Sequence, residues 1–224
     1  MTEPTTLPGV TVIGQRPIFG IMIVPTKGED GGVHQQEVSP DGDGGDGGRP
    51  ATQAEVEAEE KRQKDCAAEK FRKKLQEKSD RNSKEYFSFT FVRNGEIVTS
   101  DLQGGAGATI TGAEISAAMS QLGITSSDLL GFNHNHPSGV YCNDPQSYTR
   151  YMQEIGNAYP SAPDWNAATN LLNPDQDGAF SMYVTGCDGV QREFPYSGRV
   201  AFGQARDTKA SPPPPVQPQN CPQG

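Results

Sequence analysis

Clusters of aromatic and β-branched residues predict the strands of this chain. Glu85 to Val92 is one such run, and Asn94-Gly95 separates it from the shorter run Glu96 to Thr99. An Asn-Gly pair between two such runs is typical of a two-residue hairpin turn. The pattern therefore predicts a β-hairpin that turns at Asn94-Gly95.

A second hairpin and a buried strand are predicted further along the chain. Ala179 to Val184 and Val190 to Phe194 flank the turn residues Cys187-Asp188-Gly189. Leu129 and Leu130 form an apolar lead-in, which indicates an incoming buried strand.

Composition and spacing predict two helices. Thr111 to Met119 favours a short helix that ends at Gly123. Ala51 to about Lys78 is rich in Ala, Glu, Lys and Gln, which favours one long helix. Only its later part carries an apolar stripe, formed by Cys66, Ala67, Phe71 and Leu75. Strands and helices together indicate an α+β fold with a mixed β-sheet and flanking helices.

Polar, Gly-rich and Pro-rich segments flank this core. Ser39 to Pro50 is predicted to be a flexible acidic linker, and the run Ile18 to Val24 is either a short strand or a docking peptide. Ser211 to Gly224 holds four consecutive prolines and is predicted not to pack. The predicted units are a flexible region over 1–50, a folded domain with an N-terminal helix over 51–200, and a disordered tail over 201–224.

Charge and hydropathy argue against two classes of partner. The chain has 19 basic and 28 acidic residues, a net charge of −9, which disfavours a nucleic acid backbone as the main partner. No run is long and apolar enough to span a bilayer, and the residues after Met1 lack the basic segment of a signal peptide. Composition leaves the compartment open.

Two of the three histidines stand one residue apart in His134-Asn135-His136-Pro137. Alternate side chains of a strand share a face, so both imidazoles can point at one spot and form half of a zinc site. The alternative is a pair of hydrogen-bonded polar residues at a strand end. A catalytic zinc ion needs a third protein ligand. Asp164, in Ser161-Ala162-Pro163-Asp164, is the stronger candidate, since Asp144 also fits a turn or helix cap.

The order of these motifs resembles the JAB/MPN metallopeptidases, also called JAMM, whose signature is an upstream glutamate, His-x-His-Pro and then Ser-x-x-Asp. The residues around His134 are similar to the RadC-like branch, and the rest looks like the bacterial JAB-like modules that often end polymorphic toxins. The resemblance covers residues 64 to 198. It implies a JAB/MPN-like (cytidine-deaminase-like) fold that holds Zn²⁺ through His134, His136 and Asp164.

The resemblance also implies catalytic roles for Glu85 and Ser161. Glu85 stands at the start of the first core strand, where the family glutamate lies. Glu96 is the second candidate for the family glutamate, but its place beside a hairpin turn indicates that its side chain is exposed to solvent. In the implied mechanism zinc lowers the pKa of water toward about 7, Glu85 acts as general base and then general acid, and Ser161 hydrogen-bonds the oxyanion. The alternatives are a solvated charge at Glu85 and a plain helix cap at Ser161.

One departure from the family pattern concerns spacing. Val140 to Pro160 separates the two motifs, with Gln146 to Asn157 predicted as an inserted helix, and Ser147 stands where RadC-like spacing places the aspartate. We favour an insertion, with Asp164 as the ligand, over a degraded site.

The four cysteines, Cys66, Cys142, Cys187 and Cys221, form no Cys-x-x-Cys pair, so a cysteine-only zinc site is not indicated. Cys142 lies close to the histidines in sequence. It is more often a packed or loop residue there than a thiolate nucleophile or a fourth ligand.

The motifs favour a zinc-dependent hydrolase that cleaves a peptide or isopeptide-type amide, in a bacterial effector or toxin-type module. A protein, a ubiquitin-like conjugate and a peptidoglycan peptide all carry such amides, and the resemblance implies a secretion-machinery or immunity partner. One alternative is a catalytically inactive JAB-like binding module. Another is a metal nuclease, suggested only by the letters His-Asn-His and disfavoured by the acidic chain.

Limited proteolysis tests the predicted organisation. Met1 to Pro50 and Ser211 to Gly224 are expected to be dispensable for folding, because their composition buries too little apolar area to offset ordering entropy. The expected product is a resistant core over about residues 64 to 200. A resistant core that extends to Met1 would instead show that the Ile18 to Val24 run docks.

Overall fold

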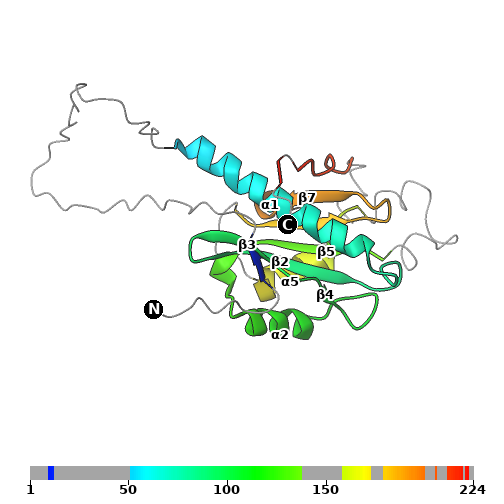
Figure 1. Cartoon of the computed structure of the whole chain (residues 1–224). Coiled ribbons are helices and arrows are strands. Elements are labelled where there is room, and N and C mark those ends of the chain that lie inside the picture. The colour runs from blue at the N-terminus through cyan, green and yellow to red at the C-terminus, as the bar shows by residue number, and fades with distance from the viewer. Residues whose placement is uncertain are drawn as a thin grey trace, which may run out of the picture.

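One mixed sheet with helices against both faces forms the core of the protein (Figure 1). The computed structural model describes residues 10–12, 51–137, 158–172, 179–199, 205, 211–218 and 220–221. Within these ranges the strand order is β1-β3-β2-β5-β6-β7, and the short β4 pairs with β2. The strands are β1 (Val10–Val12), β2 (Tyr86–Arg93), β3 (Glu96–Ser100), β4 (Gln103–Gly104), β5 (Leu129–Asn135), β6 (Ser181–Thr185) and β7 (Gln191–Pro195).

Three α-helices and three shorter helical segments accompany the sheet in the described part of the chain. They are α1 (Gln53–Gln76), α2 (Gly112–Leu122), α5 (Ala162–Ala167), the 3₁₀ turns η1 (Ser126–Asp128) and η3 (Tyr196–Gly198), and the π-helical segment η2 (Ala168–Leu172). This architecture confirms the predicted α+β fold with a mixed sheet and flanking helices. No helix among the described residues is long and apolar enough to cross a membrane.

Turn residues place both hairpins where the sequence predicts them. Asn94 and Gly95 have φ angles of 54° and 79°, and they connect β2 to its antiparallel neighbour β3. Gly189, with φ of 70°, lies in the turn between the antiparallel strands β6 and β7. Positive φ at these positions costs glycine least, which explains why the turns form there.

The face of the sheet beneath α2 and α5 is apolar. Phe87, Phe89 and Phe91 alternate along β2 and pack with Phe132 of β5 in the main core cluster. Helix α2 adds three residues to the cluster, and α5 adds Trp165. Strand β5 is buried along its whole length because it lies between β2, which is antiparallel to it, and β6, which is parallel.

The opposite face, beneath α1, is largely polar. Asn133 of β5 donates from Nδ2 to the hydroxyls of Ser88 and Thr90 on β2, at 3.3 and 3.4 Å. Apolar contact is limited to smaller clusters, in which Phe71 and Leu75 of α1 pack with Tyr86. Helix α1 begins with a capping box, and its buried residues include the predicted apolar stripe. Both the helix and the stripe are therefore confirmed.

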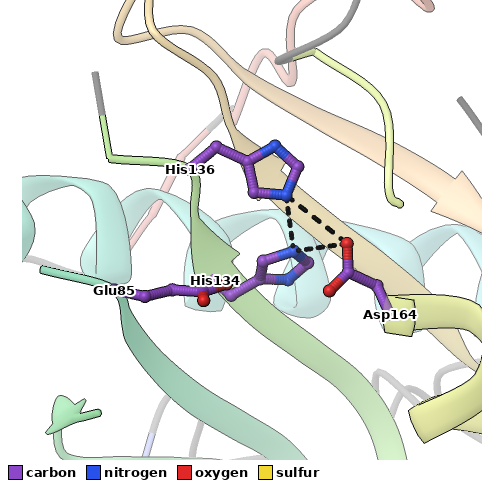
Figure 2. Close-up of side chains that lie close together, drawn as sticks. All are labelled: Glu85, His134, His136 and Asp164. Atoms are coloured by element: carbon purple, nitrogen blue, oxygen red, sulfur yellow. Dashed lines mark hydrogen bonds and ion pairs between the residues drawn. The ribbon is translucent and has the colours of Figure 1, made fainter. Parts of the chain in front are cut away.

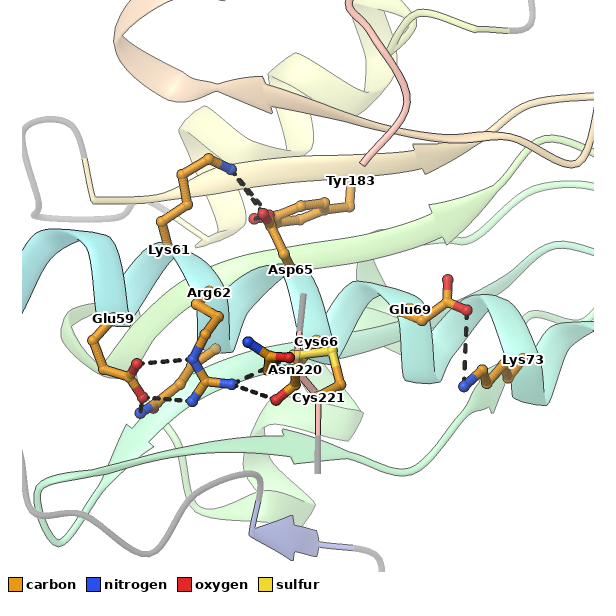
Figure 3. Close-up of a disulfide and its surroundings, with 11 residues drawn as sticks. Glu59, Lys61, Arg62, Asp65, Cys66, Glu69, Lys73, Tyr183, Asn220 and Cys221 are labelled. Carbon is orange, nitrogen blue, oxygen red and sulfur yellow. Dashed lines mark hydrogen bonds and ion pairs between the residues drawn. A yellow bond between two sulfur atoms is a disulfide. The ribbon is translucent and has the colours of Figure 1, made fainter. Parts of the chain in front are cut away.

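Polar contacts also fix α1 to the far strands of the sheet (Figure 3). The hydroxyl of Tyr183 on β6 is 3.3 Å from Asp65 and 3.1 Å from Glu193, and Lys61 bonds both carboxylates at 3.0 and 2.7 Å. Lys64, also on α1, donates to the carbonyl of Ala179 at 2.7 Å. Because hydrogen bonds depend on direction, these contacts set the angle of α1 more narrowly than apolar packing alone.

A strand that the sequence did not predict lies at the edge of the sheet. Val10 to Val12 forms β1, which pairs with β3 in antiparallel register, Val10 opposite Ser100. β-Branched residues suit a strand, and the open edge of β3 supplies backbone partners. The Ile18 to Val24 run lies outside the described residues.

The prediction that Ser211 to Gly224 does not pack is wrong for the described residues of that segment. Cys221 forms a disulfide with Cys66 of α1 (Figure 3). Arg62 donates to the carbonyl of Asn220 at 3.0 Å, and the amide of Val216 donates to Gln191 of β7 at 2.9 Å. The disulfide and the backbone hydrogen bond offset the entropy cost of ordering this segment, which its small apolar burial alone would not offset.

Ala205, which falls in the predicted tail over 201–224, is also fully buried in the main core. Packing of the C-terminal segment therefore begins before the proline run.

Removing the Cys66–Cys221 disulfide is expected to destabilise the fold. The two cysteines are 155 residues apart, and a cross-link that closes so long a loop stabilises a protein by about 2 to 5 kcal/mol. The double variant Cys66→Ser/Cys221→Ser should lower the free energy of unfolding by that amount in urea denaturation. The matched variant Arg62→Gln loses the Asn220 hydrogen bond and the ion pair with Glu59 but keeps the disulfide, and it should lose about 1 to 2 kcal/mol. An unchanged urea midpoint in the double variant would contradict this prediction.

Candidate metal centre

Strand β5 carries two histidines to the same face of the sheet at its C-terminal end. His134 lies opposite Phe87 of β2 and Val184 of β6, and its side chain is fully buried. The amide of His136 donates to the carbonyl of Thr185 at 3.0 Å, which extends the β5–β6 pairing past the end of the strand. The two rings therefore lie one above the other, with centroids 5.1 Å apart.

Helix α5 supplies a carboxylate to the same point. Ser161 is the N-cap of α5, and Pro163 lies in its first turn. The Ser161 hydroxyl accepts from the amide of Asp164 at 3.2 Å, and the Ser161 amide donates to Oδ2 of Asp164 at 2.6 Å. This capping box fixes the Asp164 carboxylate, and the same Oδ2 atom faces the histidines.

The three donor atoms form a nearly equilateral triangle (Figure 2). Nε2 of His134 and Nε2 of His136 are 3.3 Å apart, and Oδ2 of Asp164 lies 3.5 and 3.4 Å from them. Tetrahedral zinc with bonds of about 2.0 to 2.2 Å separates its ligands by about 3.3 to 3.6 Å. The spacing of the donors therefore fits a zinc ion without rearrangement.

Glu85 completes the cluster from the residue just before β2. Its amide donates to Gly107 and its carbonyl accepts from Gly105, each at 2.9 Å. Its Oε2 accepts from the amide of Ile110 at 2.9 Å. One donor atom each from Glu85, His134, His136 and Asp164 all lie within 4.8 Å of one another (Figure 2). This buried His/His/Asp/Glu group can bind a metal ion.

Asn135, between the two histidines, is a site residue that sequence reasoning missed. Alternation turns its side chain to the other face, where Oδ1 accepts from the amide of Tyr86 at 2.7 Å. Its Nδ2 donates to the carbonyls of Arg81 and Lys84, each at 3.2 Å. Asn135 therefore ties the end of β5 to the chain on both sides of Glu85. A polar residue between two histidines at a strand end was the available signal.

Burial and mutual charge shift the pKa values of three members of the cluster. Burial raises the pKa of Asp164, but the imidazoles of His134 and His136 outweigh it and hold that pKa well below its ordinary value. Burial lowers the pKa of His134, yet Asp164 and Glu85 raise it above the ordinary value overall. Burial raises the pKa of Glu85, partly opposed by His134. Asp164 is thus ionised, and Glu85 takes up a proton more readily than an exposed glutamate.

The structure brings together Glu85 and the three predicted ligands, while the other candidates lie elsewhere. Ser161 caps α5, three residues before Asp164. Glu96 begins β3 beside the hairpin turn and is not a member of the cluster. The alternatives at Asp144 and Cys142, together with Ser147 and the inserted helix Gln146 to Asn157, lie outside the described residues. Cys187 is disulfide-bonded, as are Cys66 and Cys221.

Comparison with known proteins adds no relative. A scan against protein-family models finds no match, and searches of curated proteins and of solved structures find none either. The class that fold and site define is therefore an α+β protein with a mixed sheet and a buried group of two histidines, an aspartate and a glutamate.

One zinc ion is expected to bind per chain through His134, His136 and Asp164. Replacing His134 or His136 with alanine should reduce the zinc content to well below one equivalent per chain. The measurement is elemental analysis of protein that has been dialysed against buffer containing a trace of zinc. The same loss is expected for Asp164→Ala. His34→Ala, which changes the third histidine of the chain, is the matched control and should retain a full equivalent.

Full zinc content in both histidine variants would contradict this ligand set. If only Asp164→Ala keeps its metal, Asp144 becomes the third ligand to test. As an independent measure, a chelator should lower the melting temperature of the wild type, because an ion that binds only the folded state stabilises it.

Proposed function

We propose that this protein is a zinc-dependent hydrolase of the JAMM type that cleaves a peptide or isopeptide-type amide bond. The observation that carries the proposal is the triangle of His134, His136 and Asp164 donors, with a separate buried carboxylate, Glu85, close beside it. A metal triad with a nearby base is the arrangement that metal-assisted hydrolysis requires.

The donor set suits zinc by its chemistry as well as its spacing. Two neutral imidazoles and one carboxylate are common zinc ligands, and a three-ligand set leaves one coordination position for catalysis. The low pKa of Asp164 keeps that ligand ionised, so it can bind the ion without first giving up a proton. When bound, zinc supplies Lewis acidity that lowers the pKa of water and polarises a substrate carbonyl.

Glu85 is the proposed proton shuttle. Its backbone bonds to Gly105 and Gly107 and the Ile110 amide on Oε2 hold the carboxylate near the triad. Burial raises its pKa, which brings a carboxylate closer to the neutral range in which a general base works best. Glu85 accepts a proton from the attacking water and passes it to the departing amine.

Ser161 is the proposed donor to the oxyanion. Its hydroxyl oxygen accepts from the Asp164 amide, which leaves the hydroxyl proton free for donation. The capping box orients Ser161 and Asp164 together, so donor and ligand move as one unit. A single donor of this kind contributes about 10²- to 10³-fold to the rate of acyl transfer.

The substrate is a protein or peptide. A peptidoglycan peptide and a ubiquitin-like conjugate carry amide bonds that the same reaction would cleave. An effector or toxin-type role, with a secretion-machinery or immunity partner, is supported by the motif resemblance. The place of Glu85 in the cluster favours the hydrolase over an inactive JAB-like binding module, because a binding module has no use for a buried base beside the triad.

Glu85→Gln is expected to abolish hydrolysis while zinc stays bound. Glutamine keeps the size of the side chain but cannot accept a proton, and loss of a general base costs about 10²- to 10⁴-fold in rate. The measurement is cleavage of a mixture of random-sequence peptides by the zinc-loaded protein, followed by mass spectrometry, with zinc content determined in parallel.

Glu96→Gln is the matched control and should cleave the mixture at the wild-type rate. Equal rates for Glu85→Gln and the wild type would remove Glu85 from the mechanism. A zinc-loaded wild type that cleaves neither these peptides nor an isopeptide-linked conjugate would make the inactive binding module the better account.

A further inference from the structure

A cleft adjoins the metal centre at the end of the sheet. It has a volume of about 260 Å³ and lies between the C-terminal half of α1 and the turn between β6 and β7. His136 lines it, so the cleft reaches one of the candidate zinc ligands. Sites for drug-sized ligands span about 300 to 1,000 Å³. A cleft of this size therefore takes one residue of a longer substrate.

Two charged side chains in the cleft wall are already neutralised by ion pairs. Asp188 receives two nitrogens of Arg192 at 2.7 and 3.2 Å. Arg72 uses Nε and one terminal nitrogen to bond Glu69, each at 2.7 Å, and its other terminal nitrogen has no hydrogen-bond partner among the residues that the structure describes. Because these ion pairs neutralise Asp188 and Arg72, the net charge of the cleft wall comes from one further cation.

Arg81 is that cation. It follows α1 and donates from one terminal nitrogen to the carbonyls of Gln76 and Lys78, at 3.2 and 2.9 Å. In the part of the chain that the structure describes, no carboxylate pairs with Arg81. Its Nε and second terminal nitrogen are therefore available to a ligand, and a guanidinium fork matches a carboxylate best.

Thr185 gives an independent indication of a ligand. This residue lines the cleft, is 4% exposed, and carries a buried hydroxyl without a hydrogen-bond partner among the described residues. A buried hydroxyl without a partner costs about 1 to 3 kcal/mol, so such groups are rare unless something binds to them. The Thr185 carbonyl accepts from the amide of His136, so the backbone of Thr185 is bonded directly to a residue of the metal centre.

We propose that this cleft is a substrate subsite for a carboxylate group close to the scissile amide, bound by Arg81, Thr185 and the unused nitrogen of Arg72. The inference rests on the proposed function and adds a substrate class: peptides with an acidic group near the cleaved bond. The carboxylate comes from a glutamate or aspartate side chain or from the free C-terminus of a short peptide, and both sources offer the same bidentate acceptor.

Binding of matched blocked peptides to zinc-loaded Glu85→Gln protein tests the subsite. The probes are acetyl-Ala-Glu-Ala-amide, acetyl-Ala-Gln-Ala-amide and acetyl-Ala-Ala with a free carboxylate, titrated by calorimetry. At least one of the two carboxylate probes should bind about 10- to 100-fold more tightly than the glutamine probe, since a charge-assisted hydrogen bond is worth about 1.5 to 3 kcal/mol. Whichever of the two binds more tightly identifies the source of the carboxylate.

Variants in the same background separate the cleft from the metal as the carboxylate receptor. Arg81→Gln should abolish the preference and Thr185→Val should reduce it, whereas Arg81→Lys keeps the charge but not the fork and should retain only part of it. Lys73→Gln removes a cation that α1 exposes outside the cleft, and it should change nothing. Equal affinity for carboxylate and glutamine probes overturns the proposal. A preference that survives Arg81→Gln also overturns it, because the carboxylate then binds elsewhere.

The subsite and the hydrolase fail in different ways. Carboxylate preference without cleavage of any peptide by the wild type keeps the subsite and removes the proposed function. Cleavage of the random mixture with no enrichment of either acidic residues or a free C-terminus near the cut keeps the function and removes the subsite.

Discussion

The buried contact between the Asp164 carboxylate and two imidazoles is the interaction on which the candidate site depends. An ionised carboxylate away from water needs compensating charge or hydrogen bonds. Asp164 obtains them from His134, His136 and the Ser161 amide, at 3.5, 3.4 and 2.6 Å. Because His134 lies on the central strand β5 and Asp164 on α5, the same contact that defines a metal position also fixes α5 on the sheet. Structural and chemical requirements therefore act on one set of atoms.

The two faces of the sheet are held to their helices by different interactions. Its apolar face packs aromatic residues of β2 and β5 against α2 and α5, and this packing supports the histidines from below. Its polar face meets α1 through side-chain hydrogen bonds, among them those of Asn133 and Tyr183. The cleft opens at the C-terminal end of α1, on this side of the sheet. Metal centre and cleft thus meet at one end of the sheet.

Local patterns predicted what depends on near neighbours in the sequence. A turn was predicted from Asn94-Gly95, a helix end from Gly123, and a docking face from the apolar stripe of α1. These predictions were possible because backbone sterics and helical spacing act over a few residues. The histidine pair followed from strand alternation, while the choice of Glu85 and Asp164 needed the family order of motifs. Pairing of β1 depends on backbone groups alone, and four cysteines allow three pairings, so neither β1 nor the Cys66–Cys221 bond was predictable. The cleft was also hidden, because its wall combines α1 with a turn more than a hundred residues later.

The disulfide between α1 and the C-terminal segment can form only after most of the described chain has been synthesised. Cys66 is translated 155 residues before its partner, so the cross-link cannot form while the chain between them is still being made. During that time α1 is held by Phe71, Leu75 and its polar contacts alone, and the strands that provide several of those contacts, β6 and β7, also emerge late. Domains generally fold from the N-terminus during synthesis. In this protein the cross-link on α1 therefore waits for a cysteine 155 residues further along the chain, and closing it needs an oxidant that accepts two electrons from the two thiols.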